Sequence, residues 1–215
     1  MKAKSKSSLS PDILHRLTDK FNLLKWNFEE HQQARFNRCC EMLGHFEKVH
    51  QEMIIELIGN FLRLTFSNYE KQLRLALSQA DPDLFKNIQK VYVFPLLDPD
   101  DFGRIKSSHA VVYMFKNSSI TEYHDLLKDK KVTIVDKPNY LPNSFENKII
   151  ILVDDFIGSG TTAISALEYL NEELNKPKES IIILSLVAQQ VGIEKIKEYG
   201  VSVFCQTIRC KGFSD

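Results

Sequence analysis

The sequence lacks several features that would place it in a specialised class of proteins. Its 215 residues carry 28 basic and 28 acidic side chains, so the formal net charge is zero and a globally basic nucleic-acid coat is excluded. No apolar run approaches the roughly 18–20 residues of a membrane-spanning helix. Met1 to Ser10 contains lysines at positions 2, 4 and 6 but no apolar segment behind them. We therefore expect neither a membrane span nor a secretory signal.

Cysteine is also sparse and does not form a metal-binding pattern. The four cysteines are Cys39, Cys40, Cys205 and Cys210. Two of them are adjacent, and none of the spacings is typical of a zinc site. The simplest interpretation is a reduced, cytoplasmic protein. Hydrophobic residues make up 43% of the chain, the usual share for a globular protein.

The first part of the chain has a helical pattern. Ser10-Pro11-Asp12 is typical of a helix start, with a capping hydroxyl, proline in the first turn and an early acid. Apolar residues then recur every three or four positions, which predicts amphipathic helices. The first stripe comprises Ile13, Leu14, Leu17, Phe21, Leu24 and Phe28. A second, longer stripe comprises Phe36, Cys40, Leu43, Phe46, Met53, Ile54, Leu57, Ile58 and Phe61. Ser67-Asn68 interrupts it, and residues 69–80 suit a third, shorter helix. We predict an N-terminal helical region over residues 1–83.

The second part, residues 84–215, alternates between short apolar runs and helical stretches. The expected strands are 91–96, 131–135, 147–153, 180–187 and 201–206, and the expected helices are 108–115, 162–174 and 193–199. Continuously apolar strands that alternate with helices indicate a largely parallel sheet covered on both faces. The predicted fold is therefore α/β, with a mainly parallel five-stranded sheet, flanking helices and an N-terminal helical appendage.

The most informative stretch is the end of the third expected strand and the turn that follows it. The apolar run Ile149 to Val153 is followed by Asp154 and Asp155 and then by Gly158-Ser159-Gly160-Thr161-Thr162. A parallel strand presents such carboxylates at the sheet edge where α/β proteins bind ligands. Glycines let the backbone approach an anion, and the start of the next helix offers N–H donors to it. A phosphate next to two carboxylates suggests a phosphorylated sugar, with Mg²⁺ as a further ligand of the carboxylates.

Three other interpretations explain this stretch less well. A Walker-type loop needs a lysine after its glycines, and there is none between Asp154 and Leu174. Gly158 to Ala163 matches the dinucleotide fingerprint, but the expected acid at the end of the next strand is missing, since that strand ends in Ala188-Gln189. A purely structural turn would leave two acids at the end of a very apolar strand without a ligand, which is costly.

The stretch Val153 to Thr162 resembles the phosphoribosyl pyrophosphate (PRPP) signature of type I phosphoribosyltransferases, and the order of elements resembles that family over roughly residues 88–207. The resemblance implies that Asp154 and Asp155 bind the ribose hydroxyls and Mg²⁺, and are the catalytic pair. It also implies that the 5-phosphate is bound by Gly158, Ser159, Gly160, Thr161 and Thr162.

The same resemblance assigns two further loops. The family's pyrophosphate-binding loop follows the first strand, which here implicates Asp98 to Ser108. The donors available in that loop are Arg104, Lys106, Ser107 and Ser108, although the two cations are equally explained as solvated charges. The family's mobile loop would correspond to Lys137 to Glu146.

The sequence also departs from the family pattern. Purine-salvage members usually carry an acid where this chain has Gly158, which argues against 6-oxopurine substrates. A second glycine is common in the family where Thr161 stands. Only Thr207 to Asp215 follow the fifth expected strand, so the C-terminal hood that binds the nucleobase in the family is expected to be absent or minimal.

The long helical region, the loop Asp154 to Gly160 and the segment Asp101 to Ser108 together resemble a narrower group, the phosphoribosyltransferase-like effectors of bacterial conflict systems. Some of these are encoded beside retron reverse transcriptases. The resemblance implies anti-phage defence, with a toxic or signalling activity that a reverse transcriptase and its DNA–RNA hybrid hold in check. A homo-oligomer is a further expected assembly.

Two hypotheses of different class follow. The first is an enzyme that transfers a phosphoribosyl group or hydrolyses an N-glycosidic bond. The second is a non-catalytic module that uses the PRPP or nucleotide pocket for sensing or docking. The missing hood favours the second hypothesis, and the acidic pair with its phosphate loop favours the first.

Overall fold

The computed structural model describes residues 9–26, 32–117 and 120–210. Phe28 of the first apolar stripe, the lysines at positions 2, 4 and 6, and residues 211–215 lie outside these ranges. The chain forms two compact units, Met1–Arg63 and Leu64–Asp215. The division lies before the residue 83 boundary that the sequence suggested, because the helix α4 (Phe66–Leu77) packs against strands β4 (Ile181–Gln189) and β5 (Ser202–Arg209) of the second unit.

The first unit consists of the helices α1 (Pro11–Leu23), α2 (Gln32–Leu43) and α3 (Lys48–Gly59). The Ser10 hydroxyl caps α1 by accepting the Ile13 N–H at 3.4 Å, as the sequence indicated. The core of this unit contains Ile13, Leu17 and Phe21 of the first apolar stripe, Leu43 of the second, and Ile55, which belongs to neither stripe. Contrary to the predicted pattern, Leu14, Phe46, Met53, Leu57 and Phe61 are exposed. Around this core the rings of Phe21, Trp26, Phe36 and Phe61 pack edge to face.

The second apolar stripe does not form one long helix. The chain leaves the helix after Leu43 and begins α3 at Lys48. The buried side chain of Gln51 stabilises this turn, since its Nε2 donates to the Leu43 carbonyl at 3.1 Å and to the Phe46 carbonyl at 2.8 Å. One side-chain amide thereby bonds to two carbonyl groups of the turn that follows α2.

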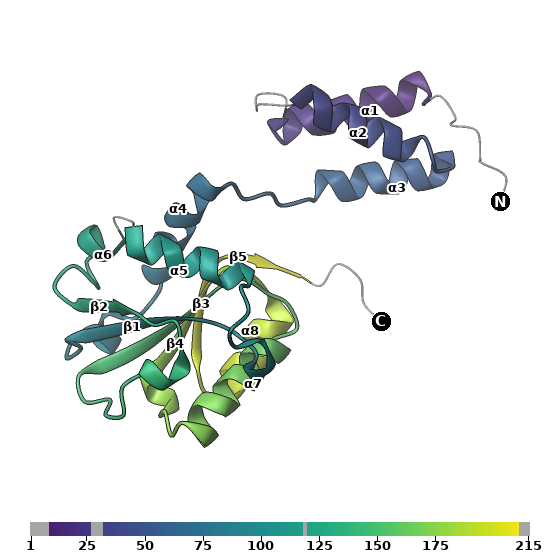
Figure 1. Ribbon diagram of the computed structural model, residues 1–215. Coiled ribbons are helices and arrows are strands. Elements are labelled where there is room, and N and C mark those ends of the chain that lie inside the picture. Colours follow the sequence, from purple (N-terminus) through teal and green to yellow (C-terminus); the bar gives the residue numbers. More distant parts are fainter. Residues whose placement is uncertain (1–8, 27–31, 118–119, 211–215) are drawn as a thin grey trace. The chain divides into compact units, whose positions relative to one another are not determined.

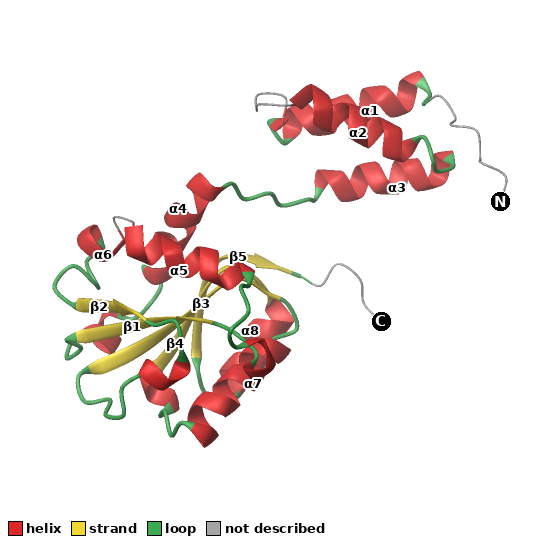
Figure 2. Ribbon diagram, viewed as in Figure 1, coloured by secondary structure: helices red, strands yellow, loops and turns green. Residues whose placement is uncertain are grey.

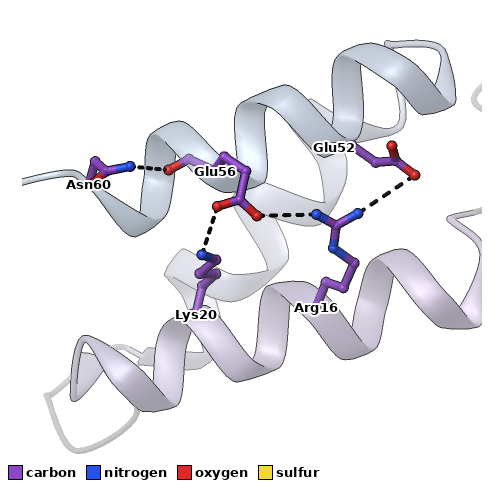
Figure 3. A network of polar contacts seen from close by, with 5 residues as sticks. All are labelled: Arg16, Lys20, Glu52, Glu56 and Asn60. Atoms are coloured by element: carbon purple, nitrogen blue, oxygen red, sulfur yellow. Dashed lines mark hydrogen bonds and ion pairs between the residues drawn. The ribbon is translucent and has the colours of Figure 1, made fainter. Parts of the chain in front are cut away.

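An ion-pair network joins α1 to α3 in the first unit (Figure 3). Glu56 accepts from Lys20 Nζ at 2.9 Å and from Arg16 at 3.1 Å, and Arg16 also lies 3.6 Å from Glu52. The two cations lower the pKa of the Glu56 carboxyl. These side chains are largely solvated, so the network contributes modestly and depends on salt.

The second unit is built on a five-stranded sheet in the order β2-β1-β3-β4-β5. Its other strands are β1 (Lys90–Pro95), β2 (Lys131–Ile134) and β3 (Lys148–Ile157). All neighbouring strands are parallel, which confirms the predicted α/β sheet. β3 continues to Ile157, beyond the expected end at Val153, because Asp154 and Phe156 still pair with Ser185 and Val187 of β4.

Helices cover both faces of this sheet (Figures 1 and 2). The helices α7 (Thr161–Glu168) and α8 (Gln190–Glu198) close one apolar core, whose sheet residues include Ile150, Leu152 and Ile183. The helix α5 (Ser107–Asn117) contacts β1 and β3 from the other face, where α4 contacts β4 and β5. The short helix α6 (Ile120–Tyr123) lies between α5 and β2 in sequence. A π-helical turn, Tyr169–Glu173, follows α7 within the stretch expected to be one α-helix.

Ser67 and Asn68 do not interrupt a helix but form the first turn of α4. The backbone N–H of Thr65 donates to Asn68 Oδ1 at 3.1 Å, which is a capping interaction at the helix start. Within the described residues 9–26, 32–117 and 120–210, no helix is both long enough and apolar enough to span a membrane.

Candidate functional site

The acidic pair lies where the order of the strands reverses. From β1 the chain proceeds to β2 on one side, whereas from β3 it proceeds to β4 on the other side. The connecting helices α5 and α7 therefore cover opposite faces, and a crevice opens between the carboxyl ends of β1 and β3. Asp154 and Asp155 occupy that end of β3, next to Leu96, whose N–H donates to the Val153 carbonyl at 2.9 Å.

The electrostatics of Asp154 are unusual for an acid. Burial, together with interaction with the neighbouring carboxylate of Asp155, raises the pKa of Asp154 to about 8. Its Oδ1 accepts the Asp155 N–H at 2.9 Å, which offsets only part of this effect. A protonated acid held between a neighbouring carboxylate and an apolar strand is poised to ionise when a cation or hydroxyl donors arrive.

A cavity of about 270 Å³ opens directly beside Asp154. It is lined by Leu96, Asp154, Phe156, Ile157, Gly158, Ser159, Gly160, Thr161, Thr162 and Ala163. The structure thus brings the predicted phosphate loop and Asp154 to one cavity. Its volume lies just below the roughly 300–1,000 Å³ typical of pockets for drug-sized ligands. The cavity therefore suits a small phosphorylated sugar.

Two glycines allow the phosphate loop to take its shape. Gly160 has a φ of 79°, the left-handed region, and it caps the start of α7. Gly192, in the first turn of α8, lies against the loop: a Cβ there would come within 2.3 Å of the Gly158 carbonyl oxygen and 3.1 Å of the Gly160 nitrogen. The sequence analysis missed Gly192. The only signal of its role is a glycine inside an otherwise helical stretch, where glycine costs about 1 kcal/mol relative to alanine.

The hydroxyl groups of the loop face outward. Ser159, Thr161 and Thr162 are exposed, and the Ser159 and Thr161 hydroxyls lie 3.0 Å apart. The first residues of α7 follow directly, so their N–H groups and these hydroxyls surround the same space. This combination is well suited to a dianionic phosphate.

The donors predicted for pyrophosphate do not line this cavity. The loop after β1 begins beside it, but Arg104 and Lys106 both pair with Asp101, at 3.2 Å and 2.8 Å. These pairs lower the pKa of Asp101. Phe102 fixes the loop by packing edge to face on Tyr169, with ring centroids 5.1 Å apart. Ser107 begins α5, and Ser108 is buried with its hydroxyl oxygen lacking a hydrogen-bond partner.

The loop between β2 and β3 is anchored by a lysine that the sequence analysis also missed. Lys176 is buried, and its Nζ donates to the Pro142 carbonyl at 2.8 Å and lies 3.4 Å from Asn143 Oδ1. The ammonium also lies 5.6 Å from the centre of the Phe145 ring. Burial lowers the pKa of Lys176. This anchor holds the second half of the segment 137–146, which the resemblance equated with a mobile loop.

The donor set around the acidic pair is limited. Among the described residues, no group of three or more His, Cys, Asp or Glu side chains could hold a metal ion. Mg²⁺ commonly uses one or two carboxylates and takes its other ligands from substrate phosphates and water. Asp154 and Asp155 therefore fit a metal that arrives with a phosphorylated ligand.

A family comparison agrees with this geometry. The model of a family described as PRTase-CE, where PRTase denotes phosphoribosyltransferase, matches residues 24–212. The chain belongs to the PRTase-CE family. It is thus phosphoribosyltransferase-like, as the sequence resemblance predicted. No significant match to a curated protein was found.

Solved phosphoribosyltransferase structures are similar to this PRTase-CE chain at low identity. One is orotate phosphoribosyltransferase from Aeropyrum pernix, with 19% identity, a TM-score of 0.41, and coverage of 67% of this chain and 72% of that chain. Another is APRTase from Giardia lamblia complexed with 9-deazaadenine, with 16% identity, a TM-score of 0.38, and coverage of 68% and 80%. The fold assignment rests on the strand order of this chain itself.

Proposed function

We propose that this PRTase-CE protein binds PRPP or a related ribose-phosphate nucleotide and catalyses phosphoribosyl transfer or N-glycosidic cleavage. The observation that carries the proposal is the shared cavity of Asp154 and the loop Gly158 to Thr162 at the point where the strand order reverses. A phosphate would lie on the loop, and the ribose would extend towards the acidic pair.

The chemistry of this site follows from its charges. The bond between C1 of the ribose and its leaving group breaks, the leaving group takes the electron pair, and positive charge develops on the sugar. Asp154 and Asp155 accept hydrogen bonds from the ribose hydroxyls and stabilise that charge, because fixed carboxylates need little reorganisation. The attacking group, a base or water, then forms the new bond to C1 and releases a proton, which passes to the leaving group or to solvent. Mg²⁺, when bound with PRPP, would neutralise charge on the departing diphosphate.

Calorimetric titration of the full chain with PRPP and Mg²⁺ tests the proposal. The variant Asp154→Asn/Asp155→Asn should lose binding while keeping its circular dichroism spectrum. The matched control is Asp83→Asn/Asp129→Asn, which removes two exposed charges from segments that precede β1 and β2, at the opposite edge of the sheet. Unchanged binding in the first variant, or equal loss in both, would contradict the assignment.

The second candidate function is a non-catalytic module that senses or docks PRPP or a nucleotide. It is favoured by the pairing of Arg104 and Lys106 with Asp101, which leaves no free cation at the predicted pyrophosphate loop in the described structure. The variant Arg104→Ala/Lys106→Ala separates the two functions. An enzyme that expels pyrophosphate should lose turnover in this variant, whereas a binding module should retain its affinity for ribose 5-phosphate and its biological effect.

The biological setting is proposed as cytoplasmic anti-phage defence beside a retron, with a reverse transcriptase and its DNA–RNA hybrid as the regulating partner and a homo-oligomer as a further assembly. A protein partner is supported by the outer face of α3, where Val49, Met53 and Leu57 recur at helical spacing and remain exposed. Phage plaque counts on cells that carry the complete operon, with wild type or Asp154→Asn/Asp155→Asn, test this role. Equal protection by both would contradict it.

A further inference from the structure

The aromatic side chains at the start of α4 belong to the unit that contains the sheet, and α4 packs on β4 and β5. Burial raises the pKa of the Tyr69 hydroxyl, and the negative charge of Asp155 raises it further. Asp155 in turn interacts with Asp154, which lines the phosphate-loop cavity.

The packing of α4 fixes this position independently of any charge. Thr207 Oγ1 of β5 donates to Oε1 of Gln72, one turn after Tyr69, at 3.4 Å. Thr207 pairs across the sheet with Val187 of β4, and Val187 pairs with Phe156 of β3. Since neighbouring strands lie about 4.8 Å apart, Thr207, which bonds to α4, lies about 10 Å from Phe156, the residue that follows the acidic pair. That distance is within the span of a nucleoside.

The ring pair itself has the character of a binding surface. The Phe66 and Tyr69 rings stack with centroids 5.4 Å apart and an interplanar angle of 25°. Phe66 remains 58% exposed, so its ring does little to fill the apolar core. An exposed aromatic face offers a stacking partner for a nucleobase, and such stacking is insensitive to the identity of the base.

The phosphate-loop cavity is small for a whole nucleotide. At about 270 Å³ it suits a ribose 5-phosphate, and a base joined to C1 would have to lie beyond the acidic pair. The sequence offered no location for base binding. α4 provides one, because it belongs to the same unit as the sheet and reaches the same edge.

We propose that Phe66 and Tyr69 form the nucleobase site of this protein, stacking a purine or pyrimidine ring whose ribose is held by Asp154 and Asp155. This inference rests on the proposed ribose-phosphate site. The Tyr69 hydroxyl can donate to a ring nitrogen or an exocyclic oxygen of the base.

The test compares ligands with and without a base. The full chain is titrated calorimetrically with ribose 5-phosphate and separately with AMP, GMP, UMP and CMP. At least one nucleotide should bind roughly 5- to 100-fold more tightly than ribose 5-phosphate, as expected for one stacked base. Phe66→Ala/Tyr69→Ala should abolish that advantage and leave the affinity for ribose 5-phosphate unchanged. Tyr69→Phe should retain most of it.

Tyr113→Ala, which removes an exposed ring from α5, is the matched control and should bind every ligand like the wild type. Circular dichroism checks that each variant is folded. If ribose 5-phosphate binds but no nucleotide binds more tightly, or if the advantage survives in Phe66→Ala/Tyr69→Ala, the aromatic site is refuted and the ribose-phosphate site stands. If the folded wild type binds neither ribose 5-phosphate nor any nucleotide, both assignments are refuted.

Discussion

The substitution Gly192→Ala probes the contact that supports the phosphate loop. The new methyl group would lie 2.3 Å from the Gly158 carbonyl oxygen and 2.9 Å from Cγ2 of Ile157, whereas ordinary contact needs at least 3.4 Å. Because the closest atom belongs to the backbone, no side-chain rotation relieves the overlap. The loop and α8 must separate by about 1 Å, which is the difference between the 2.3 Å approach and the 3.4 Å of ordinary contact.

Two opposing effects decide how much stability Gly192→Ala loses. Alanine in place of glycine favours a helix by about 1 kcal/mol, and overpacking of a closed contact costs about 1–3 kcal/mol. The net loss of stability is therefore about 0–2 kcal/mol, or a fall of at most about 8 °C in melting temperature for a chain of this size. The affinity for ribose 5-phosphate should fall by more than the stability does. Displacing one N–H from a charged phosphate costs about 1.5–3 kcal/mol, roughly 10- to 150-fold in affinity.

Calorimetric titration with ribose 5-phosphate and a thermal melt measure both effects. Gly200→Ala is the matched control, because Gly200 follows α8 with a φ of 95° and a Cβ there would meet nothing within 4 Å. That variant should lose about 1–2 kcal/mol through backbone strain alone and bind normally. If Gly192→Ala binds like the wild type and melts at a higher temperature, the support of the loop by α8 is refuted.

Two further predictions concern stability. The folded pKa of Asp154, about 8, lies above the value of about 3.9 for an unfolded chain, so the native state holds a proton that the unfolded state has lost. Relative to Asp154→Asn, the wild type should therefore lose stability in urea unfolding as pH rises from about 4 to about 8, by at most about 1.4 kcal/mol per pH unit. A difference that grows in favour of the wild type over this range would contradict the pKa direction. Glu56→Gln should weaken helix packing in the first unit at low salt, with the difference fading at high salt, as followed by helical ellipticity. The pKa of Glu56 is lowered on folding, so the wild-type advantage is present above the unfolded glutamate pKa and lost as pH falls.

The α/β part of the fold could be predicted from the sequence because the residues within each element themselves favour that element. A strand buried on both faces must be continuously apolar, and Ile149 to Val153 meets that requirement. The turn after β3 was equally predictable, since Gly160 provides the left-handed residue at the start of α7. In both cases the backbone conformation depends on residues that are neighbours in the chain.

Features that depend on side-chain contacts across a turn or between segments could not be predicted from the sequence. The stripe from Phe36 to Phe61 has helical spacing throughout, and the break within it depends on Gln51 bonding back to carbonyls of the preceding turn. Similarly, the sequence alone suggests that Lys176 is a surface charge, whereas in the structure its Nζ donates to the Pro142 carbonyl. Polar residues that stabilise a turn from outside leave no periodic signal.

The position of α4 has the largest consequence for function. The sequence of α4 has the pattern of any amphipathic helix. Such a pattern identifies the buried face of a helix but not the element against which that face packs. Grouped with the preceding helices, Tyr69 reads as a packing residue of an appendage. Because α4 packs on β4 and β5, Tyr69 belongs to the unit that contains the acidic pair, and the charge of Asp155 adds to burial in raising the pKa of its hydroxyl. A helix that precedes the sheet in sequence can therefore supply the proposed nucleobase site, because it packs on the sheet that carries the proposed ribose site.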